Sequence, residues 1–378
     1  MKIAIVHDWL TGMRGGEKCL EVFCELFPQA TIFTLLHNKG SVSRIIESMK
    51  IKTSFMQHLP KANMHYRNYL PLFPRAVESF DLKEFDFVLS SSHCVAKGAR
   101  KPPQAKHLCY CYTPMRYAWF FFEQYFGSYP SWKKKIVQAT TEYLKKWDLA
   151  TLNRVDEFMA ISETVKERIH TIYNRGAEVI YPPVDIENFQ ADSRSAQDFY
   201  LCVSSLVPYK RIDVIIEAFN QMPDKKLIIV GDGHLRKDLE QRKISKNINL
   251  LGWLPQKDLV SLYRQACCFV YAAEEDFGIA PVEAQASGVP VVAYGKGGVT
   301  ETVVALNATA AKQHPTGLFF DKQTSSSLIA AIELFEKMKQ EFSSETIRQH
   351  ALQFSRQHFK ERIQEYIHQK IGSYCYVN

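Results

Sequence analysis

The chain has 378 residues and a formal net charge of +7 at pH 7, with 46% hydrophobic and 12% aromatic residues. This is an ordinary globular composition, long enough for two domains, and no apolar run approaches the roughly 18 residues of a membrane span. The nine cysteines include no C-x-x-C pair, which argues against a disulfide framework or zinc site and predicts reduced thiols. The start, MKIAIVHDWL, becomes polar too early for a signal peptide, so we expect a cytoplasmic protein.

The positive charge is unevenly distributed. Residues 1–185 hold 25 Lys and Arg against 18 Asp and Glu, whereas residues 186–378 hold 22 of each, so the whole excess lies in the first half. A one-sided basic field suits an anionic partner such as acidic lipid, a phosphorylated acceptor or nucleic acid. A surface that is merely soluble explains the charge equally well.

In the first half, short apolar segments alternate with segments of helical spacing. The latter predict helices at 18–27 and 163–173, the second with Ser162 as its N-cap. The apolar segments predict strands at 2–9, 85–92, 106–112 and 157–162. Two prolines and a polar run in residues 179–189 then break the pattern, and we place the domain boundary there.

The alternation restarts beyond this boundary. Helices are expected at 211–222, 234–243 and 257–266 and in a tail over 325–371; strands are expected at 199–205, 225–233, 248–254 and 267–273. Buried strands separated by helices imply parallel sheets with helices on both faces. We therefore predict two doubly wound α/β domains, 1–183 and 184–355, and a C-terminal helix at 356–378 that packs back on the first. Ligands of such sheets bind at the carboxyl ends of the strands.

The segment EEDFGIAPVE, residues 274–283, follows the last of these strands. Pro281 suits the first turn of a helix that Gly288 ends, and Glu283 then falls in that first turn. A glycine-bearing loop before a helix offers free N–H groups to a diphosphate, and Glu275 and Glu283 can accept hydrogen bonds from ligand hydroxyls. The alternatives are a solvated loop acid and an acid that simply favours the helix dipole.

A second glycine loop, YGKGGVTETV, spans residues 294–303. In it Gly297 and Gly298 precede Thr300, which we take as a helix N-cap. Two such loops on adjacent strands favour a phosphate site more than either does alone. Neither fits the glycine pattern of a dinucleotide site or a P-loop.

These loops are part of a wider resemblance. In chain order, MKIAIVHDWLTGMRGGE, CYTPMRYAW, RVDEFMAISETVKERI, VIYPPVDIENF, LVPYKRIDVIIEAF, IIVGDG and AEEDFGIAPVEAQASGVPVVAYGKGGVTETV resemble the retaining family 4 glycosyltransferases (glycosyl transferases group 1). The resemblance implies a GT-B fold, with two Rossmann-like domains facing a central cleft and a helical C-terminal tail. The branch it resembles most is the mannosyltransferases of bacterial O-antigen and related surface polysaccharides.

The resemblance also implies an activity. It is transfer of a hexose, mannose from GDP-mannose, to a lipid-linked or oligosaccharide acceptor in O-antigen or lipopolysaccharide synthesis. The first domain would bind the acceptor and the second the nucleotide-sugar. No cofactor or metal is implied, and no Asp-x-Asp signature is present. The basic segments SWKKK and YLKKWD would hold the protein near anionic lipid on the inner face of the cytoplasmic membrane, unless these lysines form a solvated helix face.

Site residues are implied position by position. The catalytic candidates are Glu275, near the donor sugar, and Lys210 with Arg211, which would stabilise charge on the leaving diphosphate. The donor-binding candidates are Glu283, at the ribose, and Phe277, Gly278, Ile279, Ser205, Gly231, Gly297 and Gly298. The acceptor or cleft candidates are Gly15, Gly16, Tyr112, Thr113, Arg116 and Trp119, with core packing as the alternative for Trp119.

Two positions depart from the family pattern. Ser205 stands where the family usually has an arginine, and Tyr112 where it often has a histidine. A tyrosine can donate a hydrogen bond but cannot serve as a near-neutral base. The departures leave open a non-catalytic nucleotide-sugar-binding partner, and the fold also admits a UDP-sugar enzyme such as an epimerase. Nucleic-acid binding rests on charge alone, and we expect no nucleic-acid partner.

Overall fold

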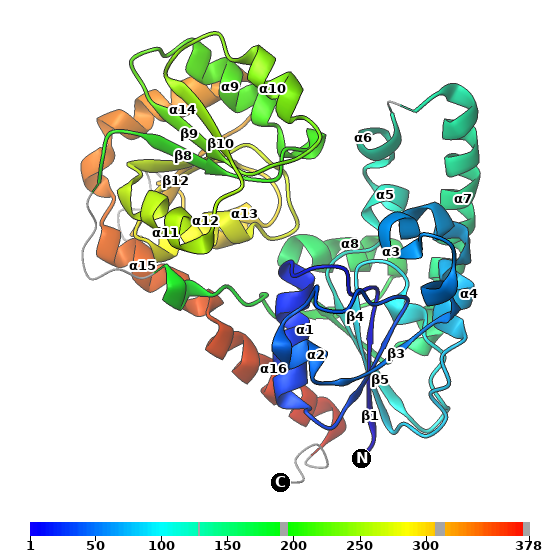
Figure 1. Cartoon of the computed structure of the whole chain (residues 1–378). Helices are drawn as coiled ribbons and strands as arrows, with labels where there is room; N and C mark the ends of the chain where they lie inside the picture. Colours follow the sequence, from blue (N-terminus) through cyan, green and yellow to red (C-terminus); the bar gives the residue numbers. More distant parts are fainter. Residues whose placement is uncertain (128, 190–195, 307–313, 373–378) are drawn as a thin grey trace. The chain divides into compact units, whose positions relative to one another are not determined.

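The computed structural model describes residues 1–127, 129–189, 196–306 and 314–372, so residues 373–378 of the predicted C-terminal helix lie outside the described chain. The chain forms two compact units. The first unit comprises Met1–Pro183 and Phe359–Asn378, and the second comprises Val184–His358. Figure 1 shows each unit as a sheet flanked by helices.

The sheet of the first unit has seven parallel strands in the order β3-β2-β1-β4-β5-β6-β7. The strands are β1 (Ile3–His7), β2 (Thr31–Thr34), β3 (Lys50–Thr53), β4 (Phe87–Ser92), β5 (Lys106–Cys111), β6 (Glu157–Ala160) and β7 (Ala177–Val179). The central strands β1 and β4 are buried along their whole length, as expected for a sheet covered on both faces. The direction of winding changes between β1 and β4, which lie side by side.

The helices of the first unit follow the predicted alternation. They are α1 (Gly15–Leu26), α2 (Arg44–Glu47), α3 (Ala62–His65), α4 (Phe73–Glu78), α5 (Arg116–Trp119), α6 (Phe122–Phe126), α7 (Ser131–Ala150), α8 (Glu163–Tyr173) and most of α16 (Arg356–Ile371). The predicted N-cap of α8 is confirmed, because the Ser162 hydroxyl accepts from the N–H of Val165 at 3.1 Å. The ring of Phe359, from α16, packs against those of Phe23 and Tyr110.

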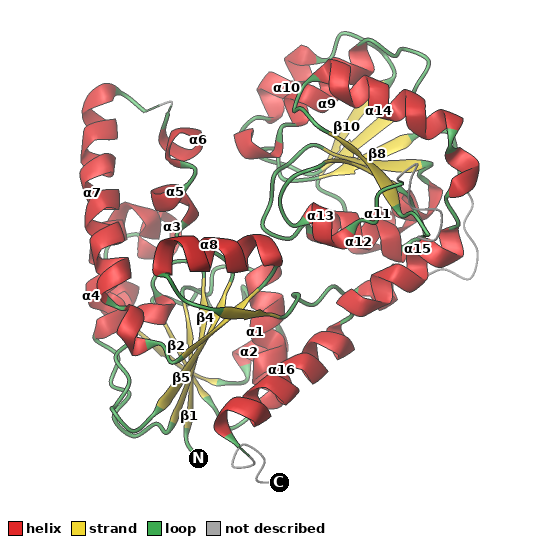
Figure 2. Cartoon of the chain, turned by 180° about the vertical axis from the view of Figure 1, so that it is seen from behind, coloured by secondary structure: helices red, strands yellow, loops and turns green. Residues whose placement is uncertain are grey.

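The second unit repeats this plan with six parallel strands in the order β10-β9-β8-β11-β12-β13. The strands are β8 (Tyr200–Val203), β9 (Leu227–Val230), β10 (Ile248–Gly252), β11 (Cys268–Tyr271), β12 (Val291–Tyr294) and β13 (Gly317–Phe320). The helices are α9 (Ile212–Asn220), α10 (Arg236–Arg242), α11 (Gln256–Gln265), α12 (Ile279–Ala286), α13 (Val299–Thr302), α14 (Ser325–Lys337) and α15 (Ser344–Ala351). Figure 2 shows α9, α10 and α14 on one face of the sheet and α11, α12 and α13 on the other. The winding changes direction between β8 and β11.

Two local predictions in this unit are wrong. The helix after the second glycine loop begins at Val299 with Gly298 as its N-cap, so Thr300 lies inside it, and its hydroxyl donates to the carbonyl of Gly297 at 2.8 Å. Glu283 is the fifth residue of α12, past the first turn, because the helix starts at Ile279, before Pro281. The helix dipole therefore does not account for an acid at position 283.

The cysteines agree with the sequence-based expectation. The eight that the structure describes are all buried and free. Burial raises the pKa of Cys24 and of Cys202 to about 12, so both remain neutral thiols. Among the described residues, no helix combines the length and the apolarity that crossing a bilayer requires.

Candidate functional site

Lys210 and Glu275 form an ion pair at the point where the winding of the second sheet reverses. Lys210 ends a short 3-10 turn (Pro208–Lys210) after β8, and Glu275 lies in the loop after the adjacent strand β11. Nζ of Lys210 pairs with Oε1 of Glu275, and the hydroxyl of Tyr271 donates to Oε2. The side chains are only 12% and 19% exposed, so each charge has its partner where water is scarce. Ligands of doubly wound sheets bind at this reversal.

The two glycine loops are joined edge to edge beside this pair. Glu275 and Gly297 form a parallel β-bridge, and the N–H of Gly298 donates to the carbonyl of Glu275 at 2.8 Å. A Cβ at Gly297 would overlap that carbonyl oxygen, and one at Gly298 would overlap the backbone of Phe277. Glycine is therefore required at both positions, because only its backbone permits this approach.

The helix α12 holds the second predicted acid. The hydroxyl of Tyr263 donates to Oε2 of Glu283 at 3.0 Å, and burial, with Glu283 alongside, raises the pKa of Tyr263 well above its usual range. Gly278 caps the helix with a left-handed φ of 92°, and Ile279 is the first helical residue. The ring of Phe277 packs against that of Phe354, so only its backbone lies along the loop.

The other donor candidates frame the loop after β8. Arg211 adopts a left-handed φ of 52° and its guanidinium pairs with Asp213 at 3.2 Å and bonds Oε1 of Gln323 at 3.4 Å. Ser205 is exposed. A Cβ at Gly231 would overlap the carbonyl oxygen of Ser204, so this glycine also serves a close backbone approach.

In the first unit, Tyr112 is tied to the start of α1, the helix that begins with Gly15 and Gly16. Its hydroxyl donates to the carbonyl of Gly16 at 2.9 Å and also bonds Ser91 Oγ at 2.7 Å. Since its one proton serves Gly16, Ser91 must donate to Tyr112 and accept from Nδ1 of His7, 2.9 Å away. Burial also raises the pKa of Tyr112 well above its usual range. The hydroxyl is therefore a neutral group whose donor is already used.

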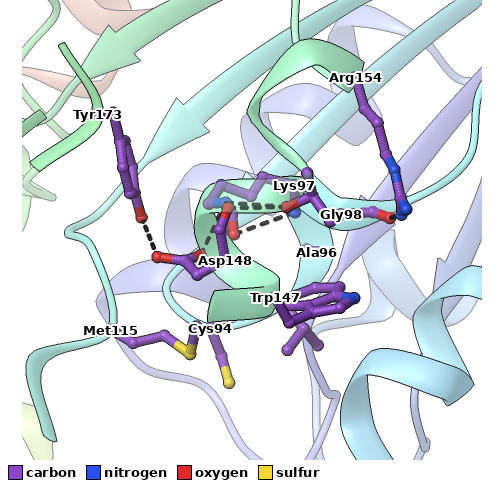
Figure 3. Close-up of polar contacts among 12 residues, drawn as sticks. Cys94, Ala96, Lys97, Gly98, Met115, Trp147, Asp148, Arg154 and Tyr173 are labelled. Carbon is purple, nitrogen blue, oxygen red and sulfur yellow. Dashed lines mark hydrogen bonds and ion pairs between the residues drawn. The ribbon is translucent and has the colours of Figure 1, made fainter. Parts of the chain in front are cut away.

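The remaining cleft candidates make contacts within the first unit. Thr113 is buried and accepts from Arg168 at 3.2 Å, and the guanidinium of Arg116 lies 4.8 Å from the centre of the Phe121 ring. The indole of Trp119 donates to Asp148 at 3.0 Å. The carboxylate of Asp148 also pairs with Lys97 at 2.7 Å and accepts from Tyr173 at 2.8 Å, as Figure 3 shows.

The predicted residues thus form two groups, one in each unit. The structure brings Lys210, Glu275, Gly297 and Gly298 into direct contact, while Ser205 and Arg211 lie in the loop after β8, where Arg211 pairs with Asp213. Sequence reasoning missed the partners that hold these residues, namely Tyr271, Tyr263, Gln323, His7 and Ser91. His7 and Tyr271 are each the last residue of a strand, but the strands predicted over 2–9 and 267–273 run two residues further, so the sequence did not mark them.

Among the described residues, no group of three or more His, Cys, Asp and Glu side chains is placed to hold a metal ion. The polar groups near the switch point of the second unit are instead a lysine, two acids, two tyrosines and the backbone of two glycine loops. Such a set offers a cation for phosphate and acceptors for hydroxyls.

An alignment over 116 positions is 38% identical to a GDP-mannose-dependent phosphatidylinositol monomannoside mannosyltransferase of Corynebacterium glutamicum, and it covers 27% of this chain and 30% of that protein. A segment of 152 residues is 28% identical to the O-antigen chain mannosyltransferase RfbU of Salmonella typhimurium, covering 38% and 43%. The aligned segments thus span less than half of either relative.

The fold comparison covers nearly the whole chain. The crystal structure of HepE from Anabaena in complex with UDP-glucose aligns with a TM-score of 0.68 at 16% identity, over 98% of this chain and 100% of that one. At this identity the likeness concerns fold alone. It confirms the predicted fold class of two Rossmann-like domains, as in GT-B glycosyltransferases, with a helical C-terminal end.

The family comparison locates the match within the chain. Residues 184–352 match the family described as Glycosyl transferases group 1. This range covers most of the second unit, Val184–His358, and includes both Lys210 and Glu275. The unit that carries this ion pair is therefore the part of the chain that matches the glycosyl transferases group 1 family.

Proposed function

We propose that the protein is a retaining glycosyltransferase that moves a hexose, mannose from GDP-mannose, to a lipid-linked or oligosaccharide acceptor of a bacterial surface polysaccharide. The observation that carries the proposal is the Lys210–Glu275 pair at the switch point of the second sheet, beside the two joined glycine loops. The family match over residues 184–352 and the two mannosyltransferase relatives support the reaction class and the sugar.

Each group has a role in this proposal. Lys210 binds the diphosphate and offsets the charge that grows on it as the sugar departs. Glu275, once Lys210 turns to the phosphates, accepts hydrogen bonds from the sugar, and Tyr271 keeps its carboxylate in place. Glu283, held by Tyr263, accepts from the ribose hydroxyls. The N–H groups at the start of α12 face the diphosphate.

Donor binding tests the proposal directly. GDP-mannose at about 100 times its Kd should stabilise the protein by about 2.7 kcal/mol, which corresponds to a rise in melting temperature of about 5–10 °C for a unit of this size. Melting temperatures measured with GDP-mannose, UDP-glucose, GDP and UDP show whether the protein prefers the guanine or the uracil nucleotide. Glu283→Gln should lose most of the shift, while Glu240→Gln, at the carboxylate that pairs with Lys243 beside α10, should keep it. If none of the nucleotide-sugars raises the melting temperature, the proposal is contradicted.

A second candidate uses a UDP-sugar on the same site. It is favoured by the fold likeness to HepE, whose crystal structure contains UDP-glucose. Radiolabelled donors distinguish the possibilities. Transfer or slow hydrolysis of the GDP-mannose label supports the first candidate, and turnover of the UDP-sugar alone supports the second. Tight binding without hydrolysis or transfer would instead indicate a non-catalytic nucleotide-sugar-binding partner.

The long helix α7 supports the proposed membrane surface. Its residues Trp132, Ile136 and Tyr143 are 67%, 57% and 47% exposed and share one helix face by their spacing. Lys135 and Lys146, both exposed, lie along one side of that face by the same spacing. An apolar stripe bordered by lysines is the pattern of a helix that lies in the headgroup region of an anionic membrane.

Vesicle binding checks this surface. Replacing Trp132 and Ile136 by serine should weaken binding to vesicles of 30% phosphatidylserine at least about 10-fold, because the buried apolar area is lost. Trp253→Ser is the matched control, since Trp253 is 73% exposed in the second unit. Co-sedimentation measures both. Equal binding of the two variants would contradict a role for α7.

A further inference from the structure

Asp8 and His93 lie at the switch point of the first sheet. Asp8 directly follows β1, and His93 directly follows β4. These strands are neighbours, and the winding of the sheet reverses between them. Ligands of doubly wound sheets bind outside the carboxyl ends of the strands at such a reversal. Neither residue belongs to the group that the family resemblance assigns.

The carboxylate of Asp8 fixes the loop that carries His93. It is fully buried and accepts four backbone N–H groups at 2.7–2.9 Å, those of His93, Cys94, Val95 and Ala96. Its Oδ2 also lies 3.1 Å from Nδ1 of His93. Because a carboxylate oxygen repels the lone pair of a bare ring nitrogen at this distance, the neutral ring is more stable with its hydrogen on Nδ1. A neutral His93 is then left with Nε2 as a bare acceptor.

The imidazole of His93 is held rigidly but stays accessible. The indole of Trp9 packs edge-on against it with ring centres 4.5 Å apart, and the Tyr112 ring lies 6.2 Å away. The side chain is 33% exposed, and the structure gives Nε2 no hydrogen-bond partner among the described residues. A polar atom fixed in this way, at a ligand-binding edge and still open to solvent, is suited to binding a substrate.

The charged surroundings keep this acceptor neutral. Burial lowers the pKa of His93 below its usual value. Asp8 and Glu17 raise the pKa and His7 and Arg14 lower it, and the net shift is downward. These groups lie on β1, on the loop after it and at the start of α1. Near pH 7 the ring is therefore uncharged, and Nε2 accepts a hydrogen bond; it loses this ability as the pH falls through the pKa.

Tyr112 explains why such an acceptor matters in this chain. The histidine that the family resemblance leads one to expect at position 112 is replaced by a tyrosine whose hydroxyl donates to Gly16 and is bonded to Ser91. That hydroxyl is therefore committed to the protein's own network. His93 supplies, from the neighbouring strand end, an imidazole 6.2 Å from the Tyr112 ring.

We propose that Nε2 of His93, with its tautomer set by Asp8, accepts a hydrogen bond from a sugar hydroxyl of the acceptor substrate and so positions that sugar for transfer. The inference rests on the proposed function, since it names a substrate contact for the same reaction. It assigns the contact to a residue of the first unit, whereas the proposed donor contacts all lie in the second.

Two variants test it. His93→Phe removes the acceptor atom, and His93→Gln places an amide oxygen near the position of Nε2. Transfer of radiolabel from GDP-mannose to a panel of methyl hexopyranosides and lipid-linked monosaccharides should fall about 10- to 100-fold in kcat/KM for His93→Phe, mainly through the acceptor KM, as for a lost substrate hydrogen bond. His93→Gln should recover much of the loss. The thermal shift caused by GDP-mannose should stay unchanged in both.

The pH profile separates this contact from a structural role. Wild-type transfer should fall on the acid side below the usual pKa of histidine, and His93→Gln should lack that decline because an amide does not titrate there. If His93→Phe has the same kcat/KM and the same pH profile as the wild type, the inference is overturned and the proposed function stands. If the wild type shows neither a thermal shift with the donor nor sugar transfer, the proposed function is overturned, and the inference with it.

Discussion

Lys210→Gln should lower kcat for sugar transfer about 100- to 1000-fold, the usual loss when one preorganised group that stabilises developing charge is removed. Lys210 is 12% exposed and pairs with Glu275, so its charge acts where solvent screens little. The neutral amide keeps most of the side-chain volume but cannot offset charge on a departing diphosphate. Initial rates with radiolabelled GDP-mannose at saturating acceptor measure the effect.

Two further variants make this result specific. Lys237→Gln removes an exposed lysine of α10 in the same unit and should leave kcat unchanged. Glu275→Gln should also lower transfer sharply, because it removes the negative charge of the pair, although the amide oxygen can still accept from Tyr271. If Lys210→Gln or Glu275→Gln transfers at the wild-type rate, the catalytic site lies elsewhere.

Lys97→Met should cost the first unit about 3–5 kcal/mol in free energy of unfolding, the usual result of breaking a buried ion pair from one side. Lys97 is 2% exposed and Asp148 is fully buried; Nζ also bonds the carbonyl of Asp148 and the hydroxyl of Thr151 (Figure 3). Methionine leaves the negative charge of Asp148 inside the protein, where the carboxylate keeps its hydrogen bonds from Trp119 and Tyr173 but loses its cation. The cost arises from that uncompensated charge.

Urea unfolding followed by tryptophan fluorescence measures this loss, because four of the five tryptophans, Trp9, Trp119, Trp132 and Trp147, lie in the first unit. The matched control is Lys2→Met, which removes the exposed Lys2–Glu84 pair of the same unit and should leave the unfolding midpoint unchanged. A midpoint for Lys97→Met equal to that of Lys2→Met would show that the buried pair does not stabilise the fold.

Most of the fold could be predicted from local pattern. The apolar runs that become β1, β4, β8 and β11 are buried on both faces, and this is why they lack the alternation of a half-exposed strand. The cap of α8 was also visible, because a serine before a helical segment has one favoured use. The errors at α12 and α13 were of two residues each, since helix starts depend on backbone geometry that residue types only bias.

The candidate site, like the fold, could be predicted from the sequence only in part. The resemblance named Lys210 and Glu275 separately, but nothing in the sequence says that they form an ion pair, because that contact requires β8 and β11 to be neighbours. Likewise, the segment SSSH places His93 just after the strand predicted over 85–92, which is a usable signal, whereas Asp8 falls inside the strand predicted over 2–9. Their contact depends on β1 lying beside β4.

The sequence by itself determined the alternation of buried strands and helices, the two-domain division and the glycines where backbones approach closely. These features follow from burial, from capping and from the steric freedom of single residues, all of which are local. Only the tertiary structure decided which strand ends meet and which side chains pair across them. That choice depends on strand order, which is set by contacts between residues far apart in the chain: Lys210 with Glu275 in one unit, and Asp8 with His93 in the other.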